Sequence, residues 1–258
     1  MTHDAGLTAL VLAGTRPGGD PLAQQAGASH KALIDVGGVP MLQRVLQALA
    51  EVPEVSRIVV AIDQPGLVEA LPVCGKPVSV LMAAAGPSAS VAKGLAELGV
   101  PLLVTTADHA LLRAAWVQEF LAAASKGSDA MFALARRESV EAAVPHTQRT
   151  WLKFADGDFS GCNLFLLRSQ NARGIVDLWQ QLEAERKRPL ALVRRLGLTY
   201  ALRYKLGWLR LDQAVARLGD LAGVRLQAVS LRDGRSAIDV DKMADLTLAR
   251  ELIGCGND

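Results

Sequence analysis

Short apolar segments alternate along this chain with longer segments of helical periodicity, and that alternation restricts the fold more than any other feature of the sequence. Apolar runs of this length are typical of parallel strands whose two faces are both covered by helices. The pattern predicts an α/β fold, a Rossmann-like three-layer α/β/α sandwich around a mostly parallel mixed sheet. The predicted strands are Leu7–Ala13, Arg57–Ile62, Val78–Met82, Leu102–Thr106, Ala130–Ala135, Asn163–Leu167 and Val224–Val229.

Helices are predicted between these strands. Leu42, Val45, Leu46 and Leu49 fall on one face of a helix that starts after Pro40. The segment from about residue 186 to 220 interrupts the alternation and is predicted to be a helical insertion within one domain of residues 1–258. The other predicted helices are Ser88–Leu98, Leu112–Ser125, Asn171–Glu185 and Met243–Ile253.

The composition fits a protein with a substantial core. Half of the 258 residues are apolar, yet no apolar run approaches the roughly 20 residues that a membrane-spanning helix needs. The N-terminus has no basic segment ahead of an apolar stretch, so no signal peptide is expected. Cys74, Cys162 and Cys255 are odd in number and widely spaced, which fits neither a disulfide framework nor a zinc site. A reducing, cytoplasmic location is therefore expected.

The formal net charge of +2 conceals a basic region. Between Arg186 and Arg210 the chain has eight Lys or Arg residues and no Asp or Glu, so the remaining 20 basic and 26 acidic residues sum to −6. A helix through 198–209 would carry two opposed apolar stripes. Leucines 198, 202, 206 and 209 form one stripe, and Tyr200, Tyr204 and Trp208 form the other.

Two stripes predict burial of one side of this helix and a second contact on the other. With the surrounding basic residues, that contact through residues 194–210 could be an anionic membrane surface or a membrane enzyme, at the inner membrane face. A homodimer interface and a lid over a substrate are the alternatives, and Gly197 and Gly207 are candidate helix breaks. Nucleic-acid binding is not expected, because leucines interleave the basic residues and no recognition motif is present.

Ligands of open α/β sheets bind beyond the carboxyl ends of the strands, so the residues that follow each strand are the candidates for chemistry. The first strand leads into a glycine-rich turn, in which backbone N–H groups can approach phosphates and Arg16 adds a cationic group. An ordinary loop is the alternative interpretation. The candidate nucleotide-binding residues here are Leu12, Ala13, Gly14, Thr15 and Arg16.

Carboxylates follow two other predicted strands. Asp108 comes directly after the apolar run that ends at Thr106, where it is well placed to bind a hard cation such as Mg²⁺. The alternative is a helix N-cap. Near the C-terminus, Asp239 and Asp241 alternate along the chain and could face one side together. Asp245 is expected in the first turn of the last helix, where negative charge suits the helix dipole.

The first strand ending in Leu-Ala-Gly-x-Arg, followed by Lys31-Ala-Leu and then Gly37-Gly38-Val-Pro-Met-Leu, resembles the NTP-transferase superfamily. Its members include MobA-like molybdenum-cofactor guanylyltransferases, sugar-1-phosphate nucleotidyltransferases and methylerythritol-phosphate cytidylyltransferases. The resemblance implies a GT-A-like nucleotidyltransferase fold in which Arg16 and Lys31 bind the triphosphate. The chain departs from the family in a shorter loop and in His30, which replaces a proline.

Three further segments extend the resemblance. Ser88–Leu95 is similar to a helix start that lies beside the base in relatives, which implies base contact by Ser90 and favours CTP slightly. Gly161-Cys-Asn163 is similar to an acceptor-binding segment, with Lys153 near the same edge. Residues 237–246 resemble the family's terminal signature, which implies that Asp241 is the second metal ligand with Asp108, with Asp239 beside it.

These observations predict a Mg²⁺-dependent nucleotidyltransferase that moves an NMP unit from CTP or GTP to a phosphorylated acceptor and releases pyrophosphate. Arg16, Lys31 and Asp108 would be its catalytic residues. A nucleotide-sugar-dependent glycosyltransferase with an Asp-x-Asp metal motif is one alternative. It is disfavoured because Asp239-Val-Asp241 lies at the last strand and not in the middle of the chain. A catalytically silent nucleotide-binding module is another, disfavoured because Arg16, Lys31, Asp108 and Asp241 occur together.

Overall fold

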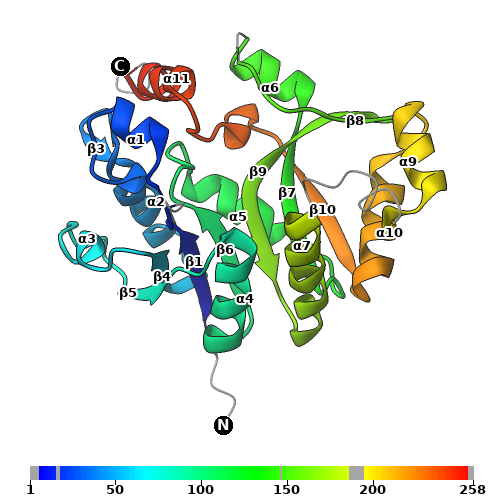
Figure 1. Ribbon diagram of the computed structural model, residues 1–258, viewed down its shortest axis with the longest axis horizontal. Helices are drawn as coiled ribbons and strands as arrows, with labels where there is room; N and C mark the ends of the chain where they lie inside the picture. Colours follow the sequence, from blue (N-terminus) through cyan, green and yellow to red (C-terminus); the bar gives the residue numbers. More distant parts are fainter. Residues whose placement is uncertain (1–5, 16–17, 146, 186–194, 255–258) are drawn as a thin grey trace.

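The computed structural model describes residues 6–15, 18–145, 147–185 and 195–254. An eight-stranded sheet runs through the molecule in the order β10-β7-β9-β6-β1-β4-β5, with β8 paired to β9 (Figure 1). All neighbouring pairs are parallel except those of β9, which runs antiparallel to β6, β7 and β8. The strands are β1 (Leu7–Leu12), β4 (Val55–Ile62), β5 (Val78–Met82), β6 (Leu102–Thr106), β7 (Ala130–Arg136), β8 (Leu152–Phe154), β9 (Gly157–Leu167) and β10 (Leu226–Leu231). The mostly parallel mixed sheet that the alternation predicts is thereby confirmed.

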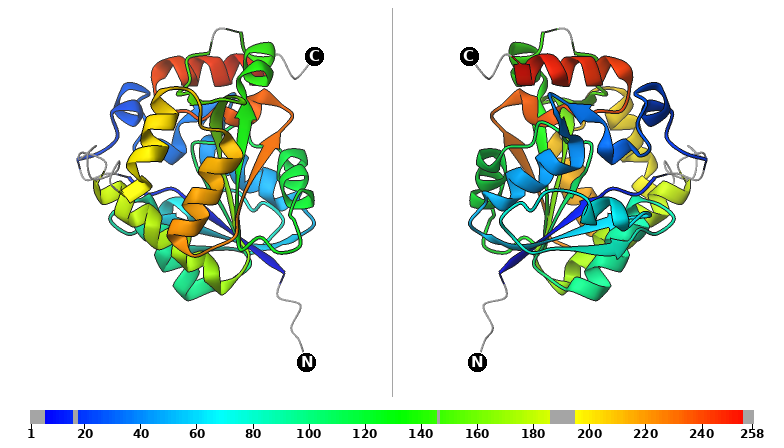
Figure 2. Two further views of the ribbon diagram at one scale, coloured as in Figure 1. Left: turned by 90° about the vertical axis from the view of Figure 1, so that its right-hand side faces the viewer. Right: turned by 90° about the vertical axis from the view of Figure 1, so that its left-hand side faces the viewer.

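Helices cover both faces of this sheet (Figures 1 and 2). Along β1, Ala9 and Val11 belong to the core beneath α2 and α5, whereas Leu10 belongs to the core beneath α4 and α7. Successive side chains of a strand point to opposite faces, which explains the division. The helices are α1 (Pro21–Gln25), α2 (Met41–Ala50), α3 (Gly66–Glu69), α4 (Pro87–Leu98), α5 (Ala114–Ala122), α6 (Arg137–Ala143), α7 (Arg173–Glu185), α9 (Leu198–Lys205), α10 (Leu211–Ala222) and α11 (Met243–Gly254), with short 3-10 turns η1 (Lys31–Leu33), η2 (Gln170–Ala172) and η3 (Gly234–Ala237).

The two glycines before α2 form the turn of a small hairpin. Strands β2 (Asp35–Val36) and β3 (Val39–Pro40) pair antiparallel, and Gly37 and Gly38 between them have φ angles of 65° and 80°. A two-residue hairpin of this kind requires positive φ at both central positions, which glycine adopts without steric cost. The hairpin leads directly into α2, whose predicted apolar face is buried.

Strand β9 is longer and less regular than the sequence predicts. It begins at Gly157 rather than at Asn163, because the polar residues between these positions pair with β7 and β8. The pairing with β7 shifts register between Phe132 and Leu134, and Asn163 lies at this irregularity with a φ of 46°. Such irregularities redirect a side chain at the edge of a sheet, and here the side chain is that of Asn163.

In the described part of the region before β10, α9 and α10 are separate helices rather than one long helix. Gly197, with a φ of 101°, precedes α9, and Gly207, with a φ of 71°, follows it. The prediction of a continuous helix to Leu209 is therefore wrong: Leu209 lies beyond the break and is buried, apart from the other leucines. Residues 186–194 of the predicted insertion lie outside the described residues. Among the residues that are described, no helix is both long and apolar enough to cross a bilayer.

We expect Gly174→Ala to destabilise the protein by about 3 kcal/mol, the upper end of the usual cost of overpacking. A Cβ atom at Gly174, at the start of α7, would overlap the backbone carbonyl oxygen of Ala222 at the end of α10. A backbone carbonyl cannot rotate away as a side chain can. Urea unfolding would measure the loss, with Gly66→Ala as the control because nothing lies within 4 Å of that position. Equal stability of the two variants would contradict this packing.

Candidate functional site

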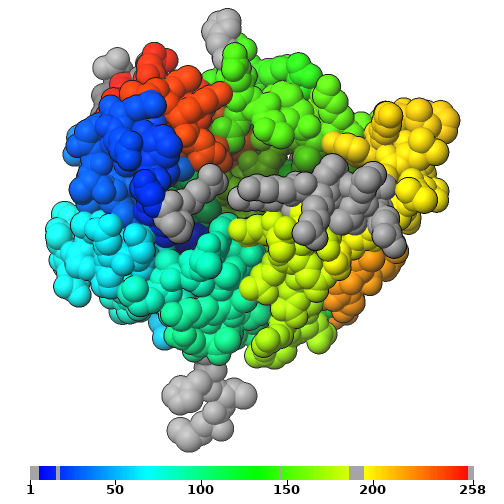
Figure 3. Space-filling model, viewed as in Figure 1, coloured from blue at the N-terminus to red at the C-terminus, as the bar shows by residue number. Residues whose placement is uncertain are grey.

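A cleft of about 650 Å³ lies at the carboxyl ends of β1 and β6 and beside the loop that follows β5. Figure 3 shows the hollow between the N-terminal segment and the green elements of the sheet. Its lining brings together residues that are far apart in sequence, including ten that the sequence predicts. These are Leu12, Ala13, Gly14, Thr15, Lys31, Ser90, Asp108, Asn163, Asp239 and Asp241. Arg16, the predicted triphosphate ligand of the glycine-rich turn, lies outside the described residues.

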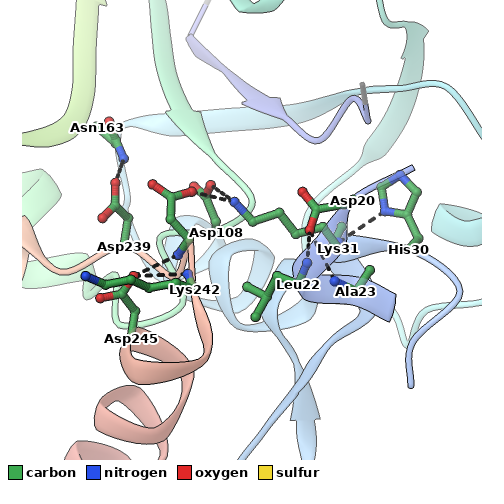
Figure 4. A network of polar contacts seen from close by, with 12 residues as sticks. Asp20, Leu22, Ala23, His30, Lys31, Asp108, Asn163, Asp239, Lys242 and Asp245 are labelled. Atoms are coloured by element: carbon green, nitrogen blue, oxygen red, sulfur yellow. Dashed lines mark hydrogen bonds and ion pairs between the residues drawn. The ribbon is translucent and has the colours of Figure 1, made fainter. Parts of the chain in front are cut away.

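Lys31 is the centre of the charged part of the cleft. Its Nζ atom donates to Oδ2 of Asp108 and to Oδ1 of Asp241, each at 2.7 Å (Figure 4 shows the contact with Asp108). Burial lowers the pKa of the Lys31 ammonium, but the attraction of Asp108 and then Asp241 outweighs it and raises the pKa above its usual value. The ammonium therefore remains charged at any physiological pH.

The two carboxylates on Lys31 differ in their surroundings. The Asp108 side chain is 19% exposed and that of Asp241 is 66% exposed. Oδ1 of Asp108 is buried and has no hydrogen-bond partner among the described residues. A buried carboxylate oxygen without a donor is costly unless something else binds it. Asp108 therefore has one oxygen free for a ligand that the chain itself does not supply.

His30 fixes the position of the glycine-rich turn relative to Lys31. Its Nδ1 accepts from the N–H of Ala32, so by hydrogen-bond assignment the proton is on Nε2. Nε2 lies 2.6 Å from Oγ1 of Thr15 and 3.2 Å from Oδ1 of Asp63, and that Asp63 oxygen also accepts from the Thr15 N–H at 3.0 Å. Burial raises the pKa of Asp63, but the hydrogen bonds from Thr15 and His30 outweigh it and the net shift is downward. This role of His30 cannot be predicted from local sequence, since its partners are spread over the first 63 residues.

Ser90 organises the loop that forms the far wall of the cleft. Its Oγ atom accepts from the N–H of Ala84 at 2.9 Å, and its side chain is buried. Helix α4 begins at Pro87 after Gly86, without a side-chain cap, so neither Ser88 nor Ser90 serves as its N-cap. Ser90 thus shapes the wall beside residues 84–87, and its hydroxyl hydrogen remains able to donate into the cleft.

A second cleft of about 420 Å³ adjoins the first and shares Asn163, Asp239 and Asp241 with it. The predicted acceptor residue Gly161 lines this second cleft, and so do the cationic residues Arg149 and Lys242. Lys153, also predicted to contact the acceptor, is exposed on β8 and lines neither cleft. Leu152, the preceding residue of β8, does line the second cleft. Because adjacent strand residues point to opposite faces, the Lys153 side chain points away from that cleft.

Arg149 is a site residue that the sequence does not indicate, because it lies in a stretch without periodicity or motif. Its guanidinium pairs with Oδ1 of Asp239, whose Oδ2 accepts from Nδ2 of Asn163 at 2.8 Å. The Arg149 side chain is largely buried, yet its Nε has no hydrogen-bond partner in the described part of the chain. Arg149 and Asn163 together engage both oxygens of Asp239. The Nε–H group of Arg149 has no acceptor among the described residues.

Asp108 and Asp241 are the residues suited to a divalent cation. Carboxylate oxygens are the ligands that Mg²⁺ prefers, and both carboxylates converge on one cation, Lys31. Asp239 is already neutralised by Arg149, which distinguishes it from the other two. Asp245 accepts from the N–H groups of Asp241 and Lys242 in the first turn of α11, as predicted, and thereby holds the Asp241 backbone in place. The described residues contain no group of three or more His, Cys, Asp or Glu side chains that could hold a metal ion.

An aromatic pair forms part of the lining of the first cleft. Phe165 of β9 and Trp179 of α7 stack with ring centroids 5.6 Å apart, and both line the cleft. An aromatic wall offers apolar surface to a ligand whose charged part would lie near Lys31. The cleft therefore has a polar, charged end and an apolar end.

Comparisons with known proteins agree with this geometry. The family model described as "MobA-like NTP transferase domain" matches residues 9–217. A hypothetical transferase from Thermus thermophilus is similar at 33% identity and a TM-score of 0.81, over 93% of this chain and 99% of that one. The fold and the site thus define a transferase of the nucleotidyltransferase class, and the chain belongs to the MobA-like NTP transferase family.

More distant structures share the fold. A 4-diphosphocytidyl-2C-methyl-D-erythritol synthase from Anaerococcus prevotii has a TM-score of 0.57 at 11% identity, over 96% of this chain and 98% of that one. A CMP:2-keto-3-deoxy-manno-octonic acid synthetase complexed with CTP has a TM-score of 0.58 at 16% identity, over 98% of this chain and 100% of that one. No curated protein matches the chain with significance.

Proposed function

We propose that this nucleotidyltransferase transfers the NMP unit of CTP or GTP to a phosphorylated small-molecule acceptor, with Mg²⁺ as cofactor and pyrophosphate as the second product. The observation that carries the proposal is the Lys31 ammonium held between Asp108 and Asp241, beside the glycine-rich turn. A permanently charged ammonium near backbone N–H groups suits a triphosphate. The two carboxylates suit a hard cation.

In the proposed reaction, an oxygen of the acceptor phosphate attacks the α-phosphorus of the NTP. A bond forms between that oxygen and phosphorus as the α–β bridging bond breaks, and the bridging oxygen leaves with pyrophosphate. Such chemistry depends on positioning and on cations where negative charge develops. Lys31, with Arg16 from the turn, would neutralise the phosphates. Asp108 and Asp241 would hold Mg²⁺, which would neutralise further phosphate charge when bound.

The shapes of the two clefts support separate places for the two substrates. The first cleft, with the turn and the wall organised by Ser90, suits the nucleotide. The second opens onto it at Asn163 and Asp239 and carries Arg149 and Lys242, which suit an anionic acceptor. The start of α4, with Ser90 followed by Val91, resembles that of cytidylyltransferases and favours CTP slightly.

Pyrophosphate release tests this proposal directly. The purified protein would be assayed with each of the four NTPs and Mg²⁺ against sugar, polyol and pterin phosphates. Release that needs one NTP and one phosphorylated acceptor is expected, with CTP or GTP as the NTP. Transfer from a nucleotide sugar instead, or a strict requirement for ATP or UTP, would contradict the proposal.

We expect Arg149→Gln to raise the KM for the acceptor about 10- to 100-fold, because a charge-assisted contact is worth roughly 1.5–3 kcal/mol. The KM for the NTP should change little, since Arg149 lies outside the first cleft. Lys153→Gln is the matched control, and its acceptor KM should remain that of the wild type. A rise for Lys153→Gln and none for Arg149→Gln would instead place the acceptor along the exposed face of β8.

A further inference from the structure

The exposed apolar side chains of this protein gather on one short helix. Nine large apolar side chains are exposed in the described residues, and five of them lie in α9 and the turn that follows it. They are Leu198, Leu202, Tyr204, Leu206 and Trp208, with exposed fractions between 40% and 72%. Helix α9 is at the edge of the molecule, far from α1 and α3 (Figures 1 and 3). Contiguous exposed apolar surface of this kind marks an interaction site.

Two of the three aromatic residues of the predicted stripe, Tyr200 and Tyr204, contact the body of the protein, whereas Trp208 lies beyond the end of α9 and is exposed. The ring of Tyr204 packs edge-on against Phe154 of β8 with centroids 5.6 Å apart, and its hydroxyl accepts from the Lys153 N–H at 3.3 Å. The guanidinium of Arg217 lies 5.3 Å from the centre of the Tyr200 ring. These contacts anchor the helix, and the leucines remain exposed among the residues that the structure describes. Leu198, Leu202 and Leu206, spaced four residues apart, and Trp208 beyond them form what we call the α9 leucine face.

The charge beside the α9 leucine face is positive. Residues 195–210 contain four basic side chains and no acidic one. Arg195 and Arg210 are paired with acidic residues from elsewhere in the chain. Arg203 donates to the neutral amide of Gln213, and Lys205 forms no ion pair with any described residue. Two cations next to the leucines therefore lack a counter-charge within the part of the chain that the structure describes.

We propose that the α9 leucine face docks the protein reversibly on an anionic lipid surface. Leucines along one side of a helix and a tryptophan just beyond its end, with Lys and Arg beside them that lack a counter-charge among the described residues, resemble the composition of helices that lie in the headgroup region. A single exposed helix presents a convex surface without a groove, and a fluid lipid surface needs no complementary shape. One helix of eight residues buries little apolar area, so the binding is weak and reversible.

Docking in this way places the second cleft beside the lipid. Strand β8 connects the two, because Phe154 contacts Tyr204 of α9 while Leu152, itself exposed, lines the second cleft. An acceptor that comes from a lipid-synthesising reaction, or a product that enters one, would then exchange at the membrane. The docking itself depends only on α9 and stands apart from the proposed transfer reaction.

Vesicle co-sedimentation tests the docking. The full-length protein would be incubated with phosphatidylcholine vesicles with and without phosphatidylglycerol, at low and high salt. Binding is expected only with phosphatidylglycerol and should weaken with salt. Leu202→Glu should reduce partitioning roughly tenfold and Lys205→Ala about fivefold. The controls are Val73→Glu, at a residue 92% exposed elsewhere, and Lys126→Ala, at an exposed lysine outside both clefts, and both should bind like the wild type.

The outcomes separate lipid from protein partners. Circular dichroism would establish that each variant is folded, and light scattering after gel filtration would give its mass. Absence of wild-type binding to either vesicle would overturn the proposal. So would a dimeric wild type that Leu202→Glu converts to a monomer, since a second copy of the chain would then cover the α9 leucine face. Equal losses for Leu202→Glu and Val73→Glu would likewise remove α9 as the docking element.

Discussion

Asp108→Asn is expected to lower the rate of nucleotidyl transfer about 10²- to 10³-fold, the usual effect of removing one preorganised electrostatic contact from a reaction centre. The substitution keeps the shape of the side chain but removes the charge that would hold Mg²⁺ with Asp241. It also removes one of the two carboxylates on Lys31. The residual activity should need a higher Mg²⁺ concentration than the wild type needs. Initial rates over a Mg²⁺ titration would measure both effects.

Asp177→Asn is the matched control for this experiment. Asp177 lies on α7 in a solvent-exposed pair with Arg173, away from both clefts. Its rate and Mg²⁺ requirement should equal those of the wild type. Thermal unfolding of both variants would show that neither loses the fold. Near-normal turnover by Asp108→Asn, with an unchanged Mg²⁺ requirement, would remove Asp108 from the proposed cation site.

Lys31→Met should lower kcat/KM for the NTP about 10²-fold or more, through a higher KM as well as a lower kcat. The ammonium would contact the phosphates in both the ground state and the transition state, so its loss affects binding and chemistry together. Without it, Asp108 and Asp241 also repel each other and any incoming phosphate. Steady-state kinetics combined with calorimetric NTP binding would separate the two contributions.

Lys126→Met is the control for the loss of one positive charge from the protein, because Lys126 is exposed and lines neither cleft. It removes the same formal charge from the protein without touching the cleft. Unchanged NTP affinity in Lys31→Met would be inconsistent with a phosphate-binding role. It would leave Lys31 as an ion-pair partner that only holds Asp108 and Asp241 together.

Much of the fold can be predicted from the sequence, because its strands are apolar runs bounded by turns. β5 and β6 have the predicted bounds, and α2 buries the face that its periodicity indicates. The first half of β9 cannot be predicted in this way, since its residues are mostly polar or glycine and are held by pairing with two other strands. The end of α9 depends on backbone geometry at Gly207, which overrides the leucine periodicity.

Part of the candidate site can likewise be predicted from the sequence, and part of it cannot. The predicted residues around Gly14, Lys31 and Asp108 do line one cleft, because carboxyl ends of neighbouring strands meet at one edge of the sheet. The pairings within the cleft join residues 77 and 210 positions apart, so local pattern does not contain them. For this reason the roles of Arg149 and His30 in the site cannot be predicted from the sequence. Each acts through partners that only the folded sheet brings near.

The two clefts are built from different parts of the chain. Apart from the residues at their junction, the first takes its polar lining from the N-terminal 108 residues, and the second takes its lining from 148–163 and 239–245. Exchange of residues 148–161 between relatives would therefore alter the lining of the second cleft, while the polar lining of the first cleft stays intact. One sheet thus supports two clefts whose linings come largely from different segments. In the proposed reaction, new acceptor preferences would arise by a few substitutions around Arg149, without any change in β1, η1 or β6.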